Sequence, residues 1–372
     1  MILERLQLTN FKNYREADVE LCGGINCFVG NNGAGKTNLL DAVYYLSFCK
    51  SYFSSLDSQN ILIGEDFFAV HGHYIDEEQT RQKVSCIYRR VQGKQMRWMD
   101  KVCKTLAEHI GRLPLVMVSP LDQSLITGDS VVRRKFLDGV ISQAVPGYLD
   151  NLIHYTKAVE QRNRLLKQMF DDRQWDESQV SLWDEQLVRF GTPIYDTRER
   201  FIEQFCPIFA QFYQSIAGTD EIPDIVYEHS TQPLGEQLAA SRQADKYQQY
   251  TTVGPHKDDL VFLLNANYTT TPLQVKRYGS QGQQKSFALA LKMAQFQYLN
   301  DSLGRKPILL LDDIFDKLDM ERVHRLIEMV GSDRFGQVLL TDTQPGRVEA
   351  IFEELPQLQH KLFNVRNGEL GR

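Results

Sequence analysis

One stretch near the start of the chain limits the possible folds more than any other feature. Residues 30–37 read Gly-Asn-Asn-Gly-Ala-Gly-Lys-Thr, which fits the pattern G-x-x-x-x-G-K-S/T without a mismatch. The apolar segment 25–29 precedes it, and residues 38–49 follow it with apolar side chains at helical spacing. A strand, a glycine-rich loop and a helix in this order predict an α/β fold with a phosphate-binding loop, or P-loop, at residues 30–37.

The residue types of the P-loop match the chemistry of a bound nucleoside triphosphate. Its glycines let backbone N–H groups turn toward phosphates, and the following helix adds the positive end of its dipole. Lys36 can reach the β- and γ-phosphates, and Thr37 can place its hydroxyl on Mg²⁺. We count Lys36 among the catalytic residues and Thr37 among the metal ligands. The predicted nucleotide-binding residues of the loop are Gly30, Asn31, Asn32, Gly33, Ala34, Gly35, Lys36, Thr37 and Asn38.

A second motif for nucleotide chemistry lies in the last quarter of the chain. Residues 308–311 are Ile-Leu-Leu-Leu, and two aspartates follow directly. Four apolar residues in a row are typical of a strand buried on both faces, and ligands of such sheets bind at the carboxyl ends of the strands. We predict that Asp312 holds Mg²⁺ and that Asp313 is the catalytic residue that polarises the attacking water. The alternative is a helix-capping Asp pair, which the P-loop in the same chain makes less favourable.

A polar turn at residues 278–286 reads Tyr-Gly-Ser-Gln-Gly-Gln-Gln-Lys-Ser, and apolar residues at helical spacing follow it. Ser280 is therefore predicted to be a helix N-cap. The order of P-loop, distant Ser-x-Gly-Gln turn, acidic strand and short Asp loop resembles the ABC-type ATPases. That resemblance implies that the nucleotide is ATP and that Ser280 acts in catalysis on ATP held by a second copy of the chain. The implied binding residues of this signature turn are Ser280, Gln281, Gly282 and Gln283.

Three further positions of this chain can be matched to the D-loop, the switch histidine and the Q-loop of the ABC-type ATPases. Residues 316–319, Asp-Lys-Leu-Asp, occupy the position of its D-loop. The apolar segment 338–341 leads to a position where many members carry a switch histidine, but this chain has Thr343 there and no histidine is assigned. Either Asp122 or Gln123 corresponds to the Q-loop residue near Mg²⁺, or both are polar loop residues without a ligand.

Longer segments are similar to one family within this class. Residues 6–14 resemble the opening strand of the SMC and RecF group, and no long heptad run separates the motifs, so no coiled-coil arm is expected. The resemblance to the RecF family runs from Met1 to about residue 370. It rests on residues 118–138, 250–262, 278–295 and 307–319, in the family's order.

The resemblance to the RecF family implies a function in bacterial recombinational repair. It implies an ATP-driven homodimer that clamps duplex DNA near single-strand gaps or junctions, helps to load recombinase with RecR and RecO, and opens on hydrolysis. The catalytic carboxylate is Asp313 where most ABC-type ATPases have Glu, so we expect slow hydrolysis suited to a switch. The competing interpretations are a transporter-type ABC subunit and a P-loop kinase that acts on a small acceptor.

The predicted fold class is α/β, an ABC-type P-loop ATPase head with an inserted, mostly helical second lobe. The head is predicted to comprise residues 1–125 and 251–372, and the insertion residues 126–250. Within the head, residues 61–104 indicate short alternating strands. Residues 231–249 are polar enough to predict a mobile connection.

The composition, 42% hydrophobic and 24% charged over 372 residues, is that of a globular protein large enough for two domains. No apolar run reaches the roughly 18 residues of a membrane span, and Glu4 and Arg5 interrupt the apolar N-terminus, so neither a span nor a signal peptide is expected. The six cysteines form no C-x-x-C pair. They predict reduced thiols, no zinc site and a cytoplasmic location.

The net charge of −6 argues against coating of nucleic acid by bulk charge. Residues 81–104 differ, because eight Lys and Arg residues accompany only Asp100, giving a local charge of +7 with Tyr88 and Trp98 between them. This basic segment either contacts DNA phosphates or is an exposed hairpin that its charges keep soluble.

Several charged residues keep two interpretations. Lys12 could reach the phosphates or be solvated. Residues 256–259, His-Lys-Asp-Asp, could be a ligand site or a structural turn between the lobes. Residues 133–135, Arg-Arg-Lys, could face DNA or serve the start of a helix, where Arg134 and Asp138 are spaced for a salt bridge.

Overall fold

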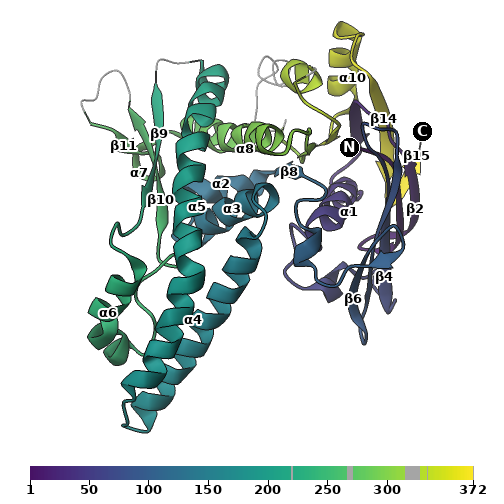
Figure 1. Cartoon of the computed structure of the whole chain (residues 1–372). Helices are drawn as coiled ribbons and strands as arrows, with labels where there is room; N and C mark the ends of the chain where they lie inside the picture. The colour runs from purple at the N-terminus through teal and green to yellow at the C-terminus, as the bar shows by residue number, and fades with distance from the viewer. Residues whose placement is uncertain (219–220, 266–270, 315–326, 333, 372) are drawn as a thin grey trace. The chain divides into compact units, whose positions relative to one another are not determined.

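The computed structural model describes residues 1–372 except 219–220, 266–270, 315–326, 333 and 372. The chain divides into two compact units (Figure 1). The first contains residues 1–121 and 299–372, and the second contains residues 122–298. Residues 251–298, which we predicted to belong to the ATPase head, therefore group with the helical unit. The functional division of the chain into an ATPase head and an insertion stays a prediction.

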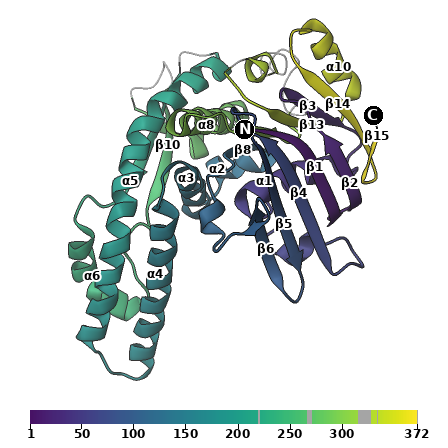
Figure 2. The ribbon, with the colours of Figure 1, turned by 45° about the vertical axis from the view of Figure 1, so that its right-hand side comes forward.

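A mainly parallel six-stranded sheet forms one layer of the first unit (Figure 2). Its strands run in the order β15 (Glu369–Gly371), β14 (His360–Arg366), β3 (Ile25–Val29), β13 (Val338–Asp342), β12 (Ile308–Leu311) and β8 (Leu115–Val118). Every residue of β3, β13 and β12 is buried, as expected for strands covered on both faces. Helix α1 (Lys36–Phe48) follows β3, and α10 (Pro345–Glu354) follows β13.

An antiparallel sheet forms the other layer, and α1 packs against strands of both sheets. Its strands run in the order β2 (Tyr14–Glu20), β1 (Ile2–Phe11), β4 (Phe67–Ile75), β5 (Arg81–Arg89), β6 (Gly93–Trp98) and β7 (Lys101–Val102). The short helical turns are η1 (Asp57–Asn60) and η2 (Ala107–His109). The alternating strands predicted within residues 61–104 are confirmed, because β4, β5 and β6 pair as consecutive hairpins.

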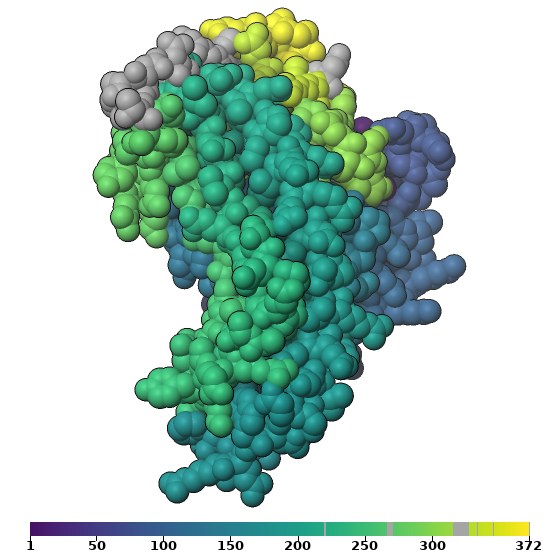
Figure 3. Space-filling model, turned by 60° about the vertical axis from the view of Figure 1, so that its left-hand side comes forward, coloured from purple at the N-terminus to yellow at the C-terminus, as the bar shows by residue number. Residues whose placement is uncertain are grey.

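The second unit combines helices with a small sheet. Its helices are α2 (Gln123–Thr127), α3 (Ser130–Ala144), α4 (Tyr148–Asp171), α5 (Glu177–Ala217), α6 (Leu234–Gln248) and α7 (Val275–Tyr278). Helix α8 (Gln281–Leu303) begins here and ends in the first unit. The antiparallel sheet has the order β11 (Leu273–Gln274), β10 (Asp259–Asn265) and β9 (Ile222–Glu228). Helices α4 and α5 pack side by side, and their side chains form much of the teal surface in Figure 3.

The mobile connection predicted at residues 231–249 is wrong, because most of it is helix α6. Leu234 and Leu238 are buried one helical turn apart. Asp245 is fully buried, and its Oδ2 accepts a hydrogen bond of 2.7 Å from Arg162 of α4. A buried ion pair and two apolar contacts hold a helix whose overall composition is polar.

No helix in the described part of the chain is long and apolar enough to cross a membrane.

Candidate functional site

The P-loop connects β3 to α1 as predicted. The helix begins at Lys36, directly after Gly35. Gly33 has φ 80° and Gly35 has φ 114°, both in the left-handed region that favours glycine. A Cβ on Gly35 would also lie within 2.9 Å of side-chain atoms of Asn13 and Tyr14. These two positions therefore require glycine for backbone conformation and, at Gly35, for close packing.

Lys36 lies over the loop that it follows. Its side chain is largely buried, and Nζ donates to the backbone carbonyls of Gly30 at 2.7 Å and Asn31 at 3.0 Å. These bonds hold the ammonium group against the backbone of the first two loop residues, in a type of loop whose N–H groups contact phosphates. The geometry agrees with the role predicted for Lys36, which stays a prediction.

Residues that the sequence motifs did not indicate hold the P-loop from outside. Asn13, in the turn between β1 and β2, donates through Nδ2 to Ala34 O at 3.2 Å and accepts from Asn38 Nδ2 at 2.7 Å. Tyr14 donates its hydroxyl hydrogen to Gly35 O at 3.1 Å. Gly368 N–H, between β14 and β15, donates to the same Ala34 O at 2.9 Å. The β1–β2 turn and the C-terminal hairpin thus fix the loop together.

The predicted metal ligands meet at the carboxyl edge of the parallel sheet. Thr37 Oγ1 donates to Asp312 Oδ1 at 2.8 Å, and Thr341 Oγ1 donates to the same atom at 2.9 Å. Burial raises the pKa of the Asp312 carboxyl above its ordinary value, while the hydrogen bonds from Thr37 and Thr341 oppose the shift. A hydroxyl and one carboxylate are hard oxygen donors, which suits Mg²⁺, since this ion takes one or two protein oxygens together with phosphate oxygens and water. The residues present therefore fit Mg²⁺.

Asp313 has an unusual backbone. Its φ of 47° lies in the left-handed region, which is uncommon for a residue with a side chain. Its N–H donates to Thr341 Oγ1 at 2.9 Å, so the threonine that bonds Asp312 also holds this conformation. Sequence reasoning treated Thr341 only as part of a strand. In the sequence, Thr341 is only a hydroxyl residue near the carboxyl end of a predicted strand. Its role can be recognised only when β13 is known to lie beside β12.

Two ion pairs in the first unit involve Lys12 and the end of strand β13. Lys12 Nζ lies 2.5 Å from Asp41 Oδ2, and both side chains are largely buried, so the solvated interpretation of Lys12 is wrong. Asp342, at the end of β13, accepts a hydrogen bond of 3.0 Å from Arg347 Nε and is almost fully buried.

The D-loop predicted at residues 316–319 lies outside the described residues.

The signature turn opens α8 as a reciprocal capping box. Ser280 Oγ accepts from Gln283 N–H at 3.2 Å, and Gln283 Oε1 accepts from Ser280 N–H at 2.7 Å. Gln283 Nε2 also donates to Glu221 Oε1 at 2.6 Å. The helix cap predicted for Ser280 is confirmed. Ser280, Gln281 and Gly282 are exposed on the second unit, which leaves them accessible to another molecule.

The two candidates for the Q-loop residue have different partners in the second unit. Asp122 Oδ1 lies 3.0 Å from Lys292 Nζ of α8, and both side chains are largely buried. Gln123 Nε2 donates to Gln284 Oε1 at 2.8 Å, one residue beyond the capping box. Both candidates therefore contact α8, Gln123 beside the signature turn and Asp122 farther along the helix. Which of the two approaches Mg²⁺ stays open.

The cluster at residues 256–259 is occupied by structural contacts. His256 Nε2 donates to Thr251 O at 3.1 Å and its Nδ1 lies 2.8 Å from the Tyr155 hydroxyl, while burial lowers its pKa to about 4. Asp258 accepts from Arg198 at 3.1 Å. Of the two interpretations, the structural turn is therefore supported.

Arg133 and Arg134 of α3 also make structural contacts with residues 258 and 259. Arg133 forms two hydrogen bonds of 2.7 Å with the Asp259 carboxylate, so it is not available to DNA. The expected salt bridge between Arg134 and Asp138 is replaced by another, because Asp138 lies 2.8 Å from Arg198 of α5. Arg134 bonds the backbone carbonyl of Asp258 instead. These contacts join α3, α5 and the start of β10.

The basic segment 81–104 occupies the outer strands of the antiparallel sheet. Lys94 is paired with Asp57 at 2.7 Å and largely buried, so it belongs to the fold. Lys83 and Arg90 make looser contacts with acidic residues, and Arg89, Lys101 and Lys104 are exposed. Part of the local charge therefore remains at the surface.

The chain matches a described protein family over most of its length. Residues 2–360 match a family described as RecF/RecN/SMC N terminal domain. A protein of Flavobacterium johnsoniae named DNA replication and repair protein RecF is 44% identical over 98% of this chain and 100% of its own length. A protein of the same name from Phocaeicola vulgatus is 43% identical over 100% of this chain and 98% of its own length. The chain belongs to the RecF family.

Solved structures agree with this membership. A structure described as the recombination mediator protein RecF with ATP, in the RecFOR pathway, is 27% identical and has a TM-score of 0.89. The match covers 100% of this chain and 97% of that one. An Smc head domain from Pyrococcus furiosus is 16% identical with a TM-score of 0.58, over 99% of this chain and 95% of its own. The second likeness concerns the fold alone. The resemblance to the RecF family and the predicted fold class are both confirmed.

Proposed function

We propose that this RecF-family protein binds DNA under the control of ATP in recombinational repair. ATP binding closes a homodimer around duplex DNA near single-strand gaps, which helps recombinase loading, and hydrolysis opens the dimer. The observation that carries the proposal is the hydrogen bond of 2.8 Å between Thr37 and Asp312. It joins the P-loop to the acidic strand, as Mg²⁺-dependent hydrolysis of a nucleoside triphosphate requires.

Each residue of the site has a role in this mechanism. The P-loop N–H groups and Lys36 bind the β- and γ-phosphates, while Thr37 and Asp312 would hold Mg²⁺. The ion neutralises charge on the phosphates when it is bound. Asp313 orients the attacking water and accepts its proton. Because the Asp side chain is one methylene shorter than that of Glu, we expect turnover below about 10 s⁻¹, the enzyme median.

Dimerisation depends on ATP through linkage. An ATP molecule favours the closed dimer only if both copies contact it, since a ligand shifts an equilibrium by its differential affinity for the two states. The exposed, capped turn at Ser280 supports this role, because its N–H groups and hydroxyl can meet the γ-phosphate held by a second copy. The ATPase head would comprise residues 1–125 and 251–372, with residues 126–250 as the inserted lobe.

DNA and protein partners complete the proposal. Duplex DNA is expected to be held by its phosphates, largely without sequence preference, and the exposed part of segment 81–104 is the candidate surface. The solved relatives described as recombination mediators in the RecFOR pathway support RecR and RecO as partners.

Light scattering of the purified protein tests the proposal. We expect a monomer with ADP and a dimer with a non-hydrolysable ATP analogue, and we expect only the dimer to retain duplex DNA. Ser280→Arg should keep ATP binding but lose the dimer, whereas Lys36→Met should weaken ATP binding itself. A Ser280→Arg protein that dimerises normally would disprove the interface. ADP formation that requires a small acceptor, with the γ-phosphoryl group transferred to that acceptor instead of released as phosphate, would favour a kinase.

A further inference from the structure

The side chain that caps the signature turn also reaches a residue outside α8. Gln283 Oε1 accepts from Ser280 N–H at 2.7 Å, and Gln283 Nε2 donates to Glu221 Oε1 at 2.6 Å. Capping boxes use Glu or Gln at this position, but an ionised carboxylate could only accept hydrogen bonds. The amide can serve both partners, because one of its ends accepts and the other donates. The glutamine at this position therefore points to its contact with Glu221, which directly precedes strand β9.

Glu221 is held from its other side by helix α5. Its Oε2 accepts from the Tyr213 hydroxyl at 2.8 Å, and the Tyr213 side chain is fully buried near the end of α5. Hydrogen bonds to an ionised acceptor are stronger than those between neutral groups. The two bonds together fix the carboxylate between α5 and the signature turn.

Aromatic rings pack the end of α5 against the start of α8. The centroid of the Phe287 ring lies 4.6 Å from that of Phe209 and 5.7 Å from that of Tyr213. Phe287 is fully buried and lies one helical turn after Gln283. Because the two helices are in contact here, Glu221 bridges elements that keep a constant separation. Its bond to Gln283 therefore gives the turn a fixed position relative to α5.

The exposed part of the signature turn requires such support. Ser280, Gln281 and Gly282 are exposed, and helix ends fray because their first N–H groups have no partner within the helix. In the proposed dimer, the same N–H groups must meet a phosphate within hydrogen-bond distance. A cap that is tied to the rest of the unit keeps them in one direction before the second copy binds, which reduces the entropy lost on binding.

We propose that Glu221 is a positioning residue for the ATP-dependent dimer. It does not contact the nucleotide but acts through Gln283, and it fixes the direction in which Ser280 and the first N–H groups of α8 face the γ-phosphate on a second copy. This inference rests on the proposed function of Ser280. The support of the turn itself can be measured without nucleotide.

Hydrogen exchange of the full chain without nucleotide, followed by mass spectrometry, tests the support of the turn. Glu221→Ala removes the acceptor, and we expect severalfold faster exchange at the amides of residues 280–284. Glu221→Gln keeps an oxygen that can accept from Gln283, so it should restore most of the protection. Tyr213→Phe removes only the hydroxyl that holds Glu221, so its effect should lie between those of the other two variants.

Light scattering with a non-hydrolysable ATP analogue tests the consequence for the dimer. Loss of one hydrogen bond should disfavour the correct turn about fivefold, and a dimer contains two turns, so Glu221→Ala should dimerise about tenfold or more weakly than the parent. Its ATP affinity as a monomer should be unchanged, because the P-loop belongs to the first unit. Glu221→Gln should dimerise at least as well as the parent, since it keeps the acceptor and removes a negative charge near a turn that faces phosphate.

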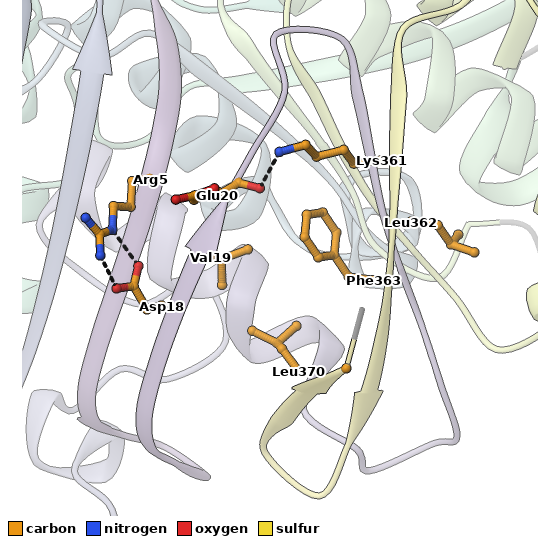
Figure 4. A pocket seen from close by; sticks show the side chains of 9 residues that line it. Arg5, Asp18, Val19, Glu20, Lys361, Leu362, Phe363 and Leu370 are labelled. Atoms are coloured by element: carbon orange, nitrogen blue, oxygen red, sulfur yellow. Dashed lines mark hydrogen bonds and ion pairs between the residues drawn. The ribbon is translucent and has the colours of Figure 1, made fainter.

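Asp18→Ala is the matched control in the first unit. Asp18 also accepts from an amide, Gln7 Nε2, at 3.1 Å and from Arg5 Nε at 2.6 Å, and it lines a pocket (Figure 4). Its removal should change neither the exchange of residues 280–284 nor dimerisation. Circular dichroism melting of each variant shows whether the fold is kept.

The proposal is overturned if Glu221→Ala behaves as the parent does in either assay. It is also overturned if Glu221→Gln is as defective as Glu221→Ala, because the charge of Glu221 and not its hydrogen bond to Gln283 would then matter. A parent that stays monomeric with the ATP analogue would refute the proposed function instead. The exchange rates would still decide in that case whether Glu221 positions the turn.

Discussion

Thr341 donates its hydroxyl hydrogen to Asp312 Oδ1 across 2.9 Å, from one strand of the parallel sheet to its neighbour. The oxygen of the same hydroxyl accepts the N–H of Asp313 at 2.9 Å. One side chain therefore orients the predicted metal ligand and holds the left-handed backbone of the predicted catalytic residue. Partners of this kind affect a metal site because they fix the direction of its ligands.

Replacing this threonine by valine should impair hydrolysis more than nucleotide binding. Thr341→Val keeps the shape of the side chain but removes both hydrogen bonds, and loss of such a partner typically costs about 10- to 100-fold in metal affinity or activity. We expect a fall of this size in ATPase rate and a higher Mg²⁺ requirement, measured by phosphate release at varied Mg²⁺. ATP affinity without Mg²⁺ should stay within about twofold. Thr80→Val, at an exposed turn, is the control, and equal rates in the two variants would contradict the role of Thr341.

Loss of the Asn13 side chain should loosen the P-loop. Asn13→Ala removes the bonds to Ala34 and Asn38, each of which contributes about 0.5–1.5 kcal/mol. We expect about tenfold weaker binding of a non-hydrolysable ATP analogue by isothermal titration calorimetry, with the turnover of the bound nucleotide less affected. The exposed Asn364→Ala should bind as the parent does. If Asn13→Ala also bound as the parent does, the loop would hold its shape without the β1–β2 turn.

Short-range patterns in the sequence were sufficient to predict the helices and loops that carry the motifs. The P-loop follows from glycines, Lys36 and Thr37 within one short segment, and the Ser280 cap follows from the helical spacing of apolar residues directly after it. Such features are decided by hydrogen bonds between near neighbours in the chain, which a pattern of residue types can represent.

Contacts between distant segments could not be predicted in this way. The role of Thr341 depends on β13 lying beside β12, and the role of Asn13 depends on a turn that packs against a loop from elsewhere in the chain. Residues 256–259 kept two interpretations, a ligand site or a structural turn, and only the contact of His256 with the distant Tyr155 favours the turn. The polar helix α6 was missed because Arg162, which neutralises its buried Asp245, lies in another helix.

The buried His256 should make stability depend on pH. Burial lowers its folded-state pKa from 6.5 to about 4, so the unfolded chain binds more protons between these values. Stability contributed by the neutral ring is therefore fully present above about pH 6.5 and is lost as the pH falls toward 4. At pH 5 the loss should be about 2 kcal/mol relative to neutral pH.

Urea denaturation at pH 7 and pH 5 measures this dependence. His256→Gln should lower stability at pH 7 but flatten the change between the two pH values. His360→Gln replaces an exposed ring and serves as the control. An unchanged slope in His256→Gln would mean that other groups cause the acid sensitivity.

Arg162 should be among the most sensitive positions of the second unit. Its guanidinium is fully buried and lies 2.8 Å from Asp184 and 2.7 Å from Asp245. Arg162→Met leaves both carboxylates without their main partner, and breaking a buried pair in this way typically costs about 3–5 kcal/mol. Arg242→Met is a matched control, because Arg242 contacts the same Asp184 at 3.1 Å but is partly exposed, where an ion pair contributes only about 0–1 kcal/mol.

Guanidinium denaturation followed by the fluorescence of Trp175 and Trp183, which flank the start of α5, compares the two variants. Arg162→Met should unfold at a clearly lower midpoint than Arg242→Met. Adding Asp184→Leu and Asp245→Leu to Arg162→Met should recover much of the loss, since burying apolar residues in place of an ion pair is often neutral or stabilising. Failure of the triple variant to recover would mean that the network, rather than its uncompensated charge, is required to join α4, α5 and α6.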